Sequence, residues 1–276
     1  MVDQDGAVSR RTLLLGGVGS ATALTAGAAG WYAIPSGPRW RIKERLGLNP
    51  DPFVPRAPEG QVRIDQVTSS VLGRTGLFTA VPEGHGDGAG LPVLVVLHGS
   101  SARIADYRDF GFPRFVTAAA RAGHPMVLAG TDPDVSGAYP DSLLVDELPV
   151  WLEERGFAAD RRALWGWSRG GRSALAHVTT HAARWSALAL FSPAVGPGDP
   201  LTTPGAAVAD LPLGLWCGLS DAFLPGTRAL AAGWPGGPDR VSTTAGGHTR
   251  QYWNDQTLAM LTWVGEQWDP APDPAP

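Results

Sequence analysis

The sequence contains one cysteine, Cys217, so a disulfide bond within the chain is excluded. Its apolar surroundings in the run 213–217 predict a buried strand residue with a structural role. Charged residues are also scarce, at 17% of the chain, whereas hydrophobic residues make up 43%. A chain of 276 residues with this composition is able to bury a large core without disulfides, and we expect a globular body.

An excess of positive charge is absent as well. The 22 Lys and Arg residues stand against 26 Asp and Glu residues, which gives a formal net charge of -4. Such a balance provides no basic surface of the kind that contacts phosphate groups. We therefore expect no nucleic-acid partner.

The first 30 residues carry a targeting pattern. Arg10 and Arg11 are followed by an uncharged stretch rich in Gly and Ala, from Leu13 to about Ala29. This arrangement is typical of a twin-arginine signal peptide, and the small residues at 26–28 fit a cleavage site. We interpret residues 1–30 as a signal that exports the folded protein, which would then be secreted or associated with the cell envelope. Left uncleaved, the same segment would attach the chain to a membrane.

The segments on either side of the body differ from it in composition. Prolines are dense between residues 49 and 59, where they remove backbone donors and favour an extended chain. We therefore interpret residues 31–60 as a linker and residues 61–268 as one folded domain. Residues 269–276 consist of Pro, Ala and Asp, which predicts a disordered tail.

Within the body, short apolar runs alternate with longer helical patterns, which predicts an α/β fold with a mostly parallel sheet flanked by helices. The eight expected strands are Val62–Ser69, Leu77–Val81, Val93–Leu97, Met126–Ala129, Ala163–Gly166, Ala187–Phe191, Leu213–Gly218 and Arg240–Thr244. The five expected helices are Phe115–Ala122, Ser142–Arg155, Arg169–Thr180, Gly226–Ala232 and Tyr252–Trp268.

The pentapeptide Gly-Trp-Ser-Arg-Gly at 166–170 lies between an expected strand and an expected helix. Gly166 and Gly170 permit a sharp, strained turn that exposes the Ser168 hydroxyl at the carboxyl end of the sheet. The pattern alone arises readily by chance in a chain with 36 glycines. Its strand–turn–helix setting is what predicts a nucleophile at Ser168.

A serine hydroxyl needs a histidine base, and the base needs a carboxylate that orients it. Asp221 follows the expected strand 213–218, and His248 follows the next strand along the chain. Taken alone, Asp221 fits a turn or a helix cap and His248 fits a surface loop. Their order after Ser168, each at a strand end, predicts instead that the three residues form a catalytic triad.

The anionic intermediate of such a reaction requires two backbone donors. The turn supplies the N–H of Arg169, and the loop that follows strand 93–97 supplies the N–H of Ser100. His98 in that loop is expected to hold the loop in place. Trp167 and Phe223 are candidates for the wall of the substrate pocket, although packing roles suit them equally.

Two other histidines, His177 and His181, share one helix face. No third ligand is evident beside them, so we predict no metal site. Nothing in the sequence indicates a cofactor, and we expect none.

Three segments of the body match motifs of one superfamily. Leu97-His98-Gly99 resembles an oxyanion loop, residues 166–171 resemble a nucleophile elbow, and His248 with Tyr252-Trp253 resembles a terminal His segment. These segments are similar to those of the α/β-hydrolase superfamily, and more narrowly of its esterase D-like branch, which includes the mycolyltransferase antigens of actinobacteria. The resemblance covers about residues 62–268. It implies an α/β-hydrolase fold and a serine esterase that cleaves a small-molecule or lipid ester through an acyl-enzyme.

The chain departs from that branch at two positions. Arg169 stands where the branch often has Met, and it would either narrow the mouth of the site, bind an acidic substrate group or remain solvated. Asp221 stands where the mycolyltransferases use glutamate, and no segment suggests their long apolar groove, so acyl transfer ranks behind ester hydrolysis. A non-catalytic, hydrolase-like binding protein and a peptidase remain alternatives, because fold does not determine function.

Overall fold

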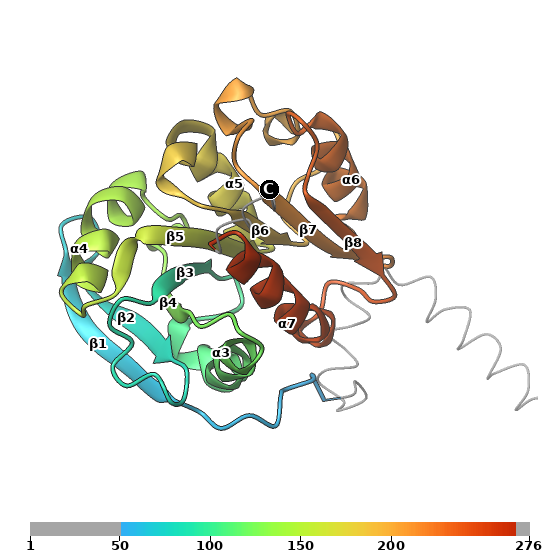
Figure 1. Cartoon of the computed structure of the whole chain (residues 1–276). Coiled ribbons are helices and arrows are strands. Elements are labelled where there is room, and N and C mark those ends of the chain that lie inside the picture. The colour runs from blue at the N-terminus through green and yellow to red at the C-terminus, as the bar shows by residue number, and fades with distance from the viewer. Residues whose placement is uncertain (1–50, 269–276) are drawn as a thin grey trace, which may run out of the picture. The chain divides into compact units, whose positions relative to one another are not determined.

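The computed structural model describes residues 51–268, and the structural statements below concern these residues. Its centre is an eight-stranded sheet in the order β1-β2-β4-β3-β5-β6-β7-β8 (Figure 1). β2 pairs antiparallel with β1 and β4, and the remaining neighbours pair in parallel. The strands are β1 (Gln61–Ser69), β2 (Gly73–Val81), β3 (Pro92–Leu97), β4 (Val127–Thr131), β5 (Ala158–Trp167), β6 (Leu188–Phe191), β7 (Leu213–Gly218) and β8 (Arg240–Thr244).

Helices cover both faces of this sheet (Figure 1). One face carries α3 (Phe112–Arg121) and α7 (Arg250–Glu266), which contact each other. The other face carries α4 (Leu148–Glu153), α5 (Arg169–His181) and α6 (Leu224–Gly233).

Every residue of strand β3 is apolar, because the strand is covered on both faces. Val95 and Leu97 pack into the core under α4, α5 and α6, whereas Leu94 and Val96 pack into the core under α3 and α7. Successive side chains of a strand point to opposite faces, so a strand covered on both sides must be apolar throughout. The α/β-hydrolase fold expected from the sequence, with about eight mostly parallel strands, is confirmed.

The predicted helix over residues 142–155 is interrupted. A π-helical turn, η2 (Leu143–Glu147), precedes α4, and the N–H of Leu148 donates to the carbonyl of Leu143. Pro149 explains the interruption, because it has no N–H and its ring clashes with the carbonyl four residues earlier. The wider turn accommodates the proline without ending the helical path.

Ordered packing begins before residue 61, within the segment predicted as a linker. The ring of Phe53 lies 5.9 Å from that of Phe115, and the side chain of Asn254 donates to the Phe53 carbonyl at 2.8 Å. Glu59 accepts a hydrogen bond from Arg108 at 2.8 Å. Residues 53–59 are thus tied to the domain, whereas the predicted signal 1–30, residues 31–50 and the tail 269–276 lie outside the described residues.

The single cysteine lies in the core, as its apolar neighbours predicted. Cys217 is fully buried in β7, where burial raises the pKa of its thiol to about 11. Among residues 51–268, no helix is both long enough and apolar enough to cross a membrane.

Candidate active site

Ser168 occupies the turn between β5 and α5 in a strained backbone conformation. Its φ of 53° is positive and its ψ is -121°, a combination that L-residues adopt only when their surroundings enforce it. A Cβ on Gly170 would collide with the carbonyl oxygen of Leu97, and one on Gly166 would lie 2.6 Å from the carbonyl oxygen of Gly170. The two glycines therefore permit the tight turn that presents Ser168 at the strand end.

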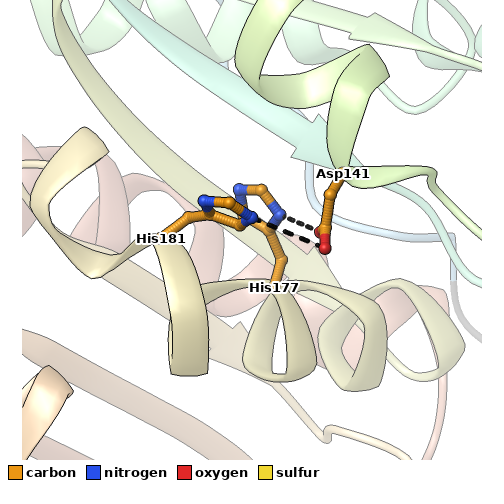
Figure 2. Close-up of side chains that lie close together, drawn as sticks. All are labelled: Asp141, His177 and His181. Carbon is orange, nitrogen blue, oxygen red and sulfur yellow. Dashed lines mark hydrogen bonds and ion pairs between the residues drawn. The ribbon is translucent and has the colours of Figure 1, made fainter.

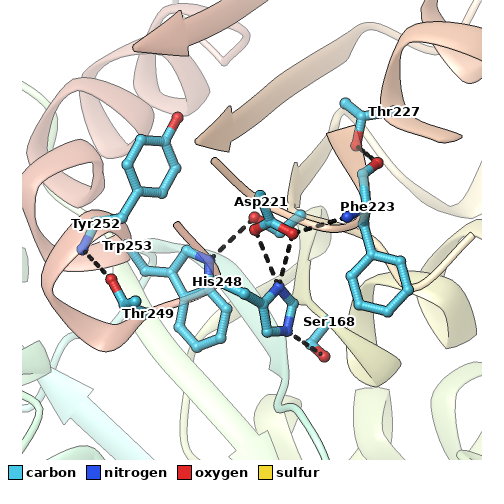
Figure 3. Close-up of polar contacts among 9 residues, drawn as sticks. Ser168, Asp221, Phe223, Thr227, His248, Thr249, Tyr252 and Trp253 are labelled. Carbon is cyan, nitrogen blue, oxygen red and sulfur yellow. Dashed lines mark hydrogen bonds and ion pairs between the residues drawn. The ribbon is translucent and has the colours of Figure 1, made fainter. Parts of the chain in front are cut away.

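The structure brings the three predicted triad residues together (Figure 3). His248 Nε2 lies 2.9 Å from Ser168 Oγ, and His248 Nδ1 lies 3.0 Å from Asp221 Oδ2. The Asp221 side chain is fully buried, whereas the His248 side chain is 24% exposed. This geometry suits a serine nucleophile with a histidine base and an orienting carboxylate.

Two strand-end loops position the acid and the base. The N–H of Ser220, just after β7, donates to the Gly246 carbonyl at 2.8 Å, which joins the Asp221 loop to the His248 loop. A Cβ on Gly218 would collide with that same Gly246 carbonyl, so a glycine permits the close approach. Immediately after His248, Thr249 caps α7 by accepting a hydrogen bond from the Tyr252 N–H at 3.1 Å.

Asp221 and His248 are held on their remaining sides as well. Asp221 Oδ1 accepts the N–H of Phe223 at 2.9 Å, which satisfies part of the buried carboxylate. The His248 ring lies between two aromatic contacts, with Phe223 at 5.1 Å and Trp253 at 4.9 Å (Figure 3). Both contacts are edge-to-face, the arrangement that aromatic rings favour.

The loop after β3 lies directly against the nucleophile. A Cβ on Gly99 would be 3.2 Å from the Cβ of Ser168 and 2.9 Å from Trp167 Nε1, so no larger residue fits there without displacement. Ser100 follows Gly99 and Arg169 follows Ser168, so the two predicted oxyanion donors belong to segments in contact.

His98 forms hydrogen bonds that hold the loop after β3 in place, the role expected for it from the sequence. Its Nδ1 lies 2.9 Å from the Gly99 carbonyl and its Nε2 lies 3.0 Å from Asp132 Oδ1. Burial alone would raise the pKa of Asp132, but hydrogen bonds from His98 and from the Ile104 N–H lower it. The backbone N–H of His98 also donates to the hydroxyl oxygen of Tyr139 at 3.1 Å.

Asp132 and Tyr139 were missed by the sequence reasoning. Asp132 stands directly after β4, so it carries the same strand-end signal that identified Asp221. Tyr139 lies in an irregular loop 41 residues from His98, and no sequence pattern links the two.

The two residues predicted to line the pocket differ in exposure. Trp167 is 1% exposed, and its ring packs against Trp165 and Phe112 below the elbow. Phe223 is partly exposed beside His248. Trp167 therefore supports the elbow from beneath, whereas Phe223 occupies a position open to a substrate.

Two arginines near Ser168 form no salt bridge among residues 51–268. Arg169 is exposed, and its guanidinium lies against Gly137, where a Cβ would collide with it. Arg250, which the sequence reasoning missed, places its guanidinium 3.5 Å from the Phe110 ring centre and 4.8 Å from that of Trp167. Burial lowers the pKa of Arg250 to about 9, so the group stays charged at neutral pH and the aromatic faces stabilise it.

Comparisons with known proteins bear on the fold and on the family. Residues 121–216 match the model of the Esterase family, described as "Putative esterase", and no curated protein matches the chain. A ferulic acid esterase shares the fold with a TM-score of 0.68 at 18% identity, over 76% of this chain and 100% of that one.

Two further solved structures are similar. An S-formylglutathione hydrolase from Agrobacterium tumefaciens has a TM-score of 0.61 at 17% identity, over 79% of this chain and 99% of that one. A fluorophosphonate-binding serine hydrolase from Staphylococcus aureus has a TM-score of 0.59 at 15% identity, over 75% and 99%. These structures show that the chain has the α/β-hydrolase fold, and the match of residues 121–216 to the Esterase family agrees with the esterase D-like resemblance of its motifs.

Proposed function

We propose that this protein is a serine esterase that hydrolyses carboxylic esters through an acyl-enzyme. The observation that carries the proposal is the continuous hydrogen-bonded chain from Ser168 Oγ through His248 to Asp221. The match to the Esterase family supports the same class of reaction.

In the first half of the reaction, Ser168 Oγ attacks the ester carbonyl carbon while His248 Nε2 takes the hydroxyl proton. Collapse of the tetrahedral intermediate breaks the bond to the alcohol oxygen, which receives that proton from His248. In the second half, His248 removes a proton from water, which attacks the acyl-enzyme. The carboxylic acid then leaves, and Ser168 recovers its proton.

Asp221 supports both halves from behind His248. As an acceptor at His248 Nδ1, its carboxylate keeps a proton on that nitrogen and leaves Nε2 free to act as the base. It also stabilises the imidazolium that forms in each transition state. Full burial of the carboxylate strengthens this interaction, since little water screens it.

The negative charge that develops on the carbonyl oxygen needs fixed donors. The backbone N–H groups of Arg169 and Ser100 are our candidates, each contributing about 3 kcal/mol of transition-state stabilisation. Two features support this assignment. The Ser168 turn has a strained backbone, and His98 is hydrogen-bonded to the Gly99 carbonyl and to Asp132, so both segments are held in position before a substrate binds.

The test is the Ser168→Ala variant, assayed with a short-chain nitrophenyl ester. We expect loss of hydrolysis, loss of labelling by a fluorophosphonate probe, and an unchanged unfolding midpoint. Retained hydrolysis in a folded Ser168→Ala protein would exclude the mechanism. Absence of labelling of the wild-type protein would favour the alternative of a non-catalytic binding protein.

Acyl transfer is the second candidate for the same triad, since an alcohol can replace water in the second half of the reaction. Product analysis with an added alcohol acceptor separates the two: free acid indicates hydrolysis, and a new ester indicates transfer. A series of esters with increasing acyl length would define the substrate, which we expect to be a small-molecule or lipid ester.

We also propose that residues 1–30 direct export by the twin-arginine route, with retention at the membrane if they are not cleaved. The paired Arg10 and Arg11 support this. Replacement of both by lysine should leave the enzyme in the cytoplasm, and export of that variant would contradict the proposal.

A further inference from the structure

A cluster of two histidines and one aspartate lies apart from the triad. His177 and His181 are one turn apart on α5, and their rings stack with centres 4.8 Å apart (Figure 2). Asp141 stands just before η2, at the start of the same helical path, and points its carboxylate at both rings (Figure 2). This aspartate is the third ligand that the sequence did not reveal, because it lies 36 residues before His177.

The ligand atoms already converge. His177 Nδ1 lies 2.5 Å from Asp141 Oδ1, and His181 Nε2 lies 3.5 Å from Asp141 Oδ2. One ligand atom from each residue falls within 4.8 Å of the other two. A tetrahedral site with bonds of about 2.0–2.2 Å places its ligand atoms roughly 3.3 Å apart. Small rotations of exposed Asp141 and partly exposed His181 would reach that spacing.

The donor set determines which ion fits. Two imidazole nitrogens and one carboxylate oxygen suit a borderline divalent cation such as Zn²⁺ and are a poor set for Mg²⁺ or Ca²⁺, which prefer oxygen ligands. The Asp141 side chain is 57% exposed, so water has access to a fourth position. His181 is the last residue of α5, where the helix dipole favours a cation.

His177 is the buried member of the cluster. Its side chain is 2% exposed, and its Nε2 is buried without a hydrogen-bond partner among the described residues. The Nδ1 atom is the one that faces Asp141, so it is the nitrogen that His177 offers to an ion.

We propose that Asp141, His177 and His181 bind one divalent transition-metal ion, with Zn²⁺ as the best fit. The ion would join the helical residues just before η2 to the end of α5 and stabilise the fold. Ser168 stands at the opposite end of α5, about 14 Å from His177 and about 20 Å from His181 by the rise of the helix. The site therefore lies outside the catalytic machinery, and its occupancy should leave ester hydrolysis unchanged.

The experiment uses the full chain, treated with a chelator and desalted. Calorimetric titration with ZnCl₂ should show one ion bound per chain, whereas MgCl₂ should give no saturable binding. Zinc in about hundredfold excess over its Kd should raise the Tm by about 5–10 °C. Binding of Co²⁺ should give visible d–d absorption, which reports coordination directly.

Variants locate the ion. Asp141→Ala and His181→Ala should each weaken Zn²⁺ binding about tenfold or more and abolish the Co²⁺ absorption. His85→Ala, which removes an exposed histidine from another loop, is the matched control and should bind like the wild type. His177 is left intact because its burial makes a replacement prone to unfolding. No saturable Zn²⁺ binding by the wild type, or unchanged binding by His181→Ala, would overturn the proposal and leave a purely structural Asp141–His177 hydrogen bond.

Discussion

The indole of Trp253 stands edge-to-face against the imidazole of His248, with ring centres 4.9 Å apart and an interplanar angle of 85°. The Trp253 Nε1–H donates to Ser192 Oγ at 3.3 Å, which fixes the indole from the other side. Ser192 is buried and has a positive φ of 46°, so its own position is firmly determined. The catalytic base candidate thus rests against a side chain that is anchored to the end of β6.

Trp253→Ala should lower kcat about 10–100-fold with little change in KM, because His248 loses a wall that keeps it directed at Ser168. Trp253→Phe keeps an aromatic ring and loses only the bond to Ser192, so its loss should be only a few-fold. Steady-state kinetics well below the Tm of each variant separates positioning from unfolding. Equal kcat values for Trp253→Ala and the wild type would show that the ring merely fills space.

Asp221→Asn should lower kcat by about 10³–10⁴-fold while the fold persists. The amide no longer favours a proton on His248 Nδ1, so Nε2 is protonated in a larger fraction of molecules and cannot act as the base. Crystallography or circular dichroism would verify the fold, and ester hydrolysis would give the rate. A loss below tenfold would argue for a different acid.

The triad residues found from the sequence share one property: each lies at or shortly after the carboxyl end of a strand. The carboxyl ends of parallel strands meet at one edge of the sheet, so Ser168, Asp221 and His248 are brought together by topology alone. The fold class followed in the same way from the alternation of apolar runs and helical patterns. Strand ends and apolar patterns can be read from short stretches of the sequence, so they can be predicted without knowledge of side-chain contacts.

The residues that were missed depend on contacts between distant segments. Tyr139 contacts the backbone N–H of His98 from an irregular loop, and Asp141 contacts α5 from the helical residues just before η2. Arg250 lies among rings from two other segments, Phe110 and Trp167. No periodicity of the sequence encodes these contacts, because they join segments that are far apart in the chain and connected by irregular structure.

Asp132→Asn should lower kcat several-fold, since a neutral amide holds His98 less firmly and the adjoining Gly99–Ser100 segment becomes looser. KM should change less, because the oxyanion donors act mainly in the transition state. Kinetics on one nitrophenyl ester would measure both constants. A variant that alters KM alone would place Asp132 in substrate binding instead.

The same substitution makes a prediction about pH. The pKa of Asp132 is lower in the folded protein than its unfolded value of about 3.9, so the ionised carboxylate stabilises the fold above that pH. This contribution is lost as the pH falls through the folded-state pKa. The wild type should therefore exceed Asp132→Asn in unfolding free energy at pH 7, and the difference should shrink below about pH 4. Urea denaturation at both pH values tests this, and a difference independent of pH would contradict it.

Gly170→Ala should damage both stability and activity, because the added methyl meets backbone and not a movable side chain. Its Cβ would collide with the Leu97 carbonyl and lie 2.6 Å from the His98 carbonyl oxygen. Relief requires α5 to separate from the loop after β3, which we expect to cost about 1–3 kcal/mol of unfolding free energy. The same separation moves the N–H of Arg169 away from that of Ser100, so kcat should fall by about tenfold or more.

Gly205→Ala is the matched control for Gly170→Ala. A Cβ at Gly205 would meet nothing within 4 Å, and the backbone φ of -69° at that residue suits alanine. That variant should be as active as the wild type and equally or slightly more stable. If Gly170→Ala behaved like Gly205→Ala, the contact between the elbow and the loop after β3 would not be what sets the active-site geometry.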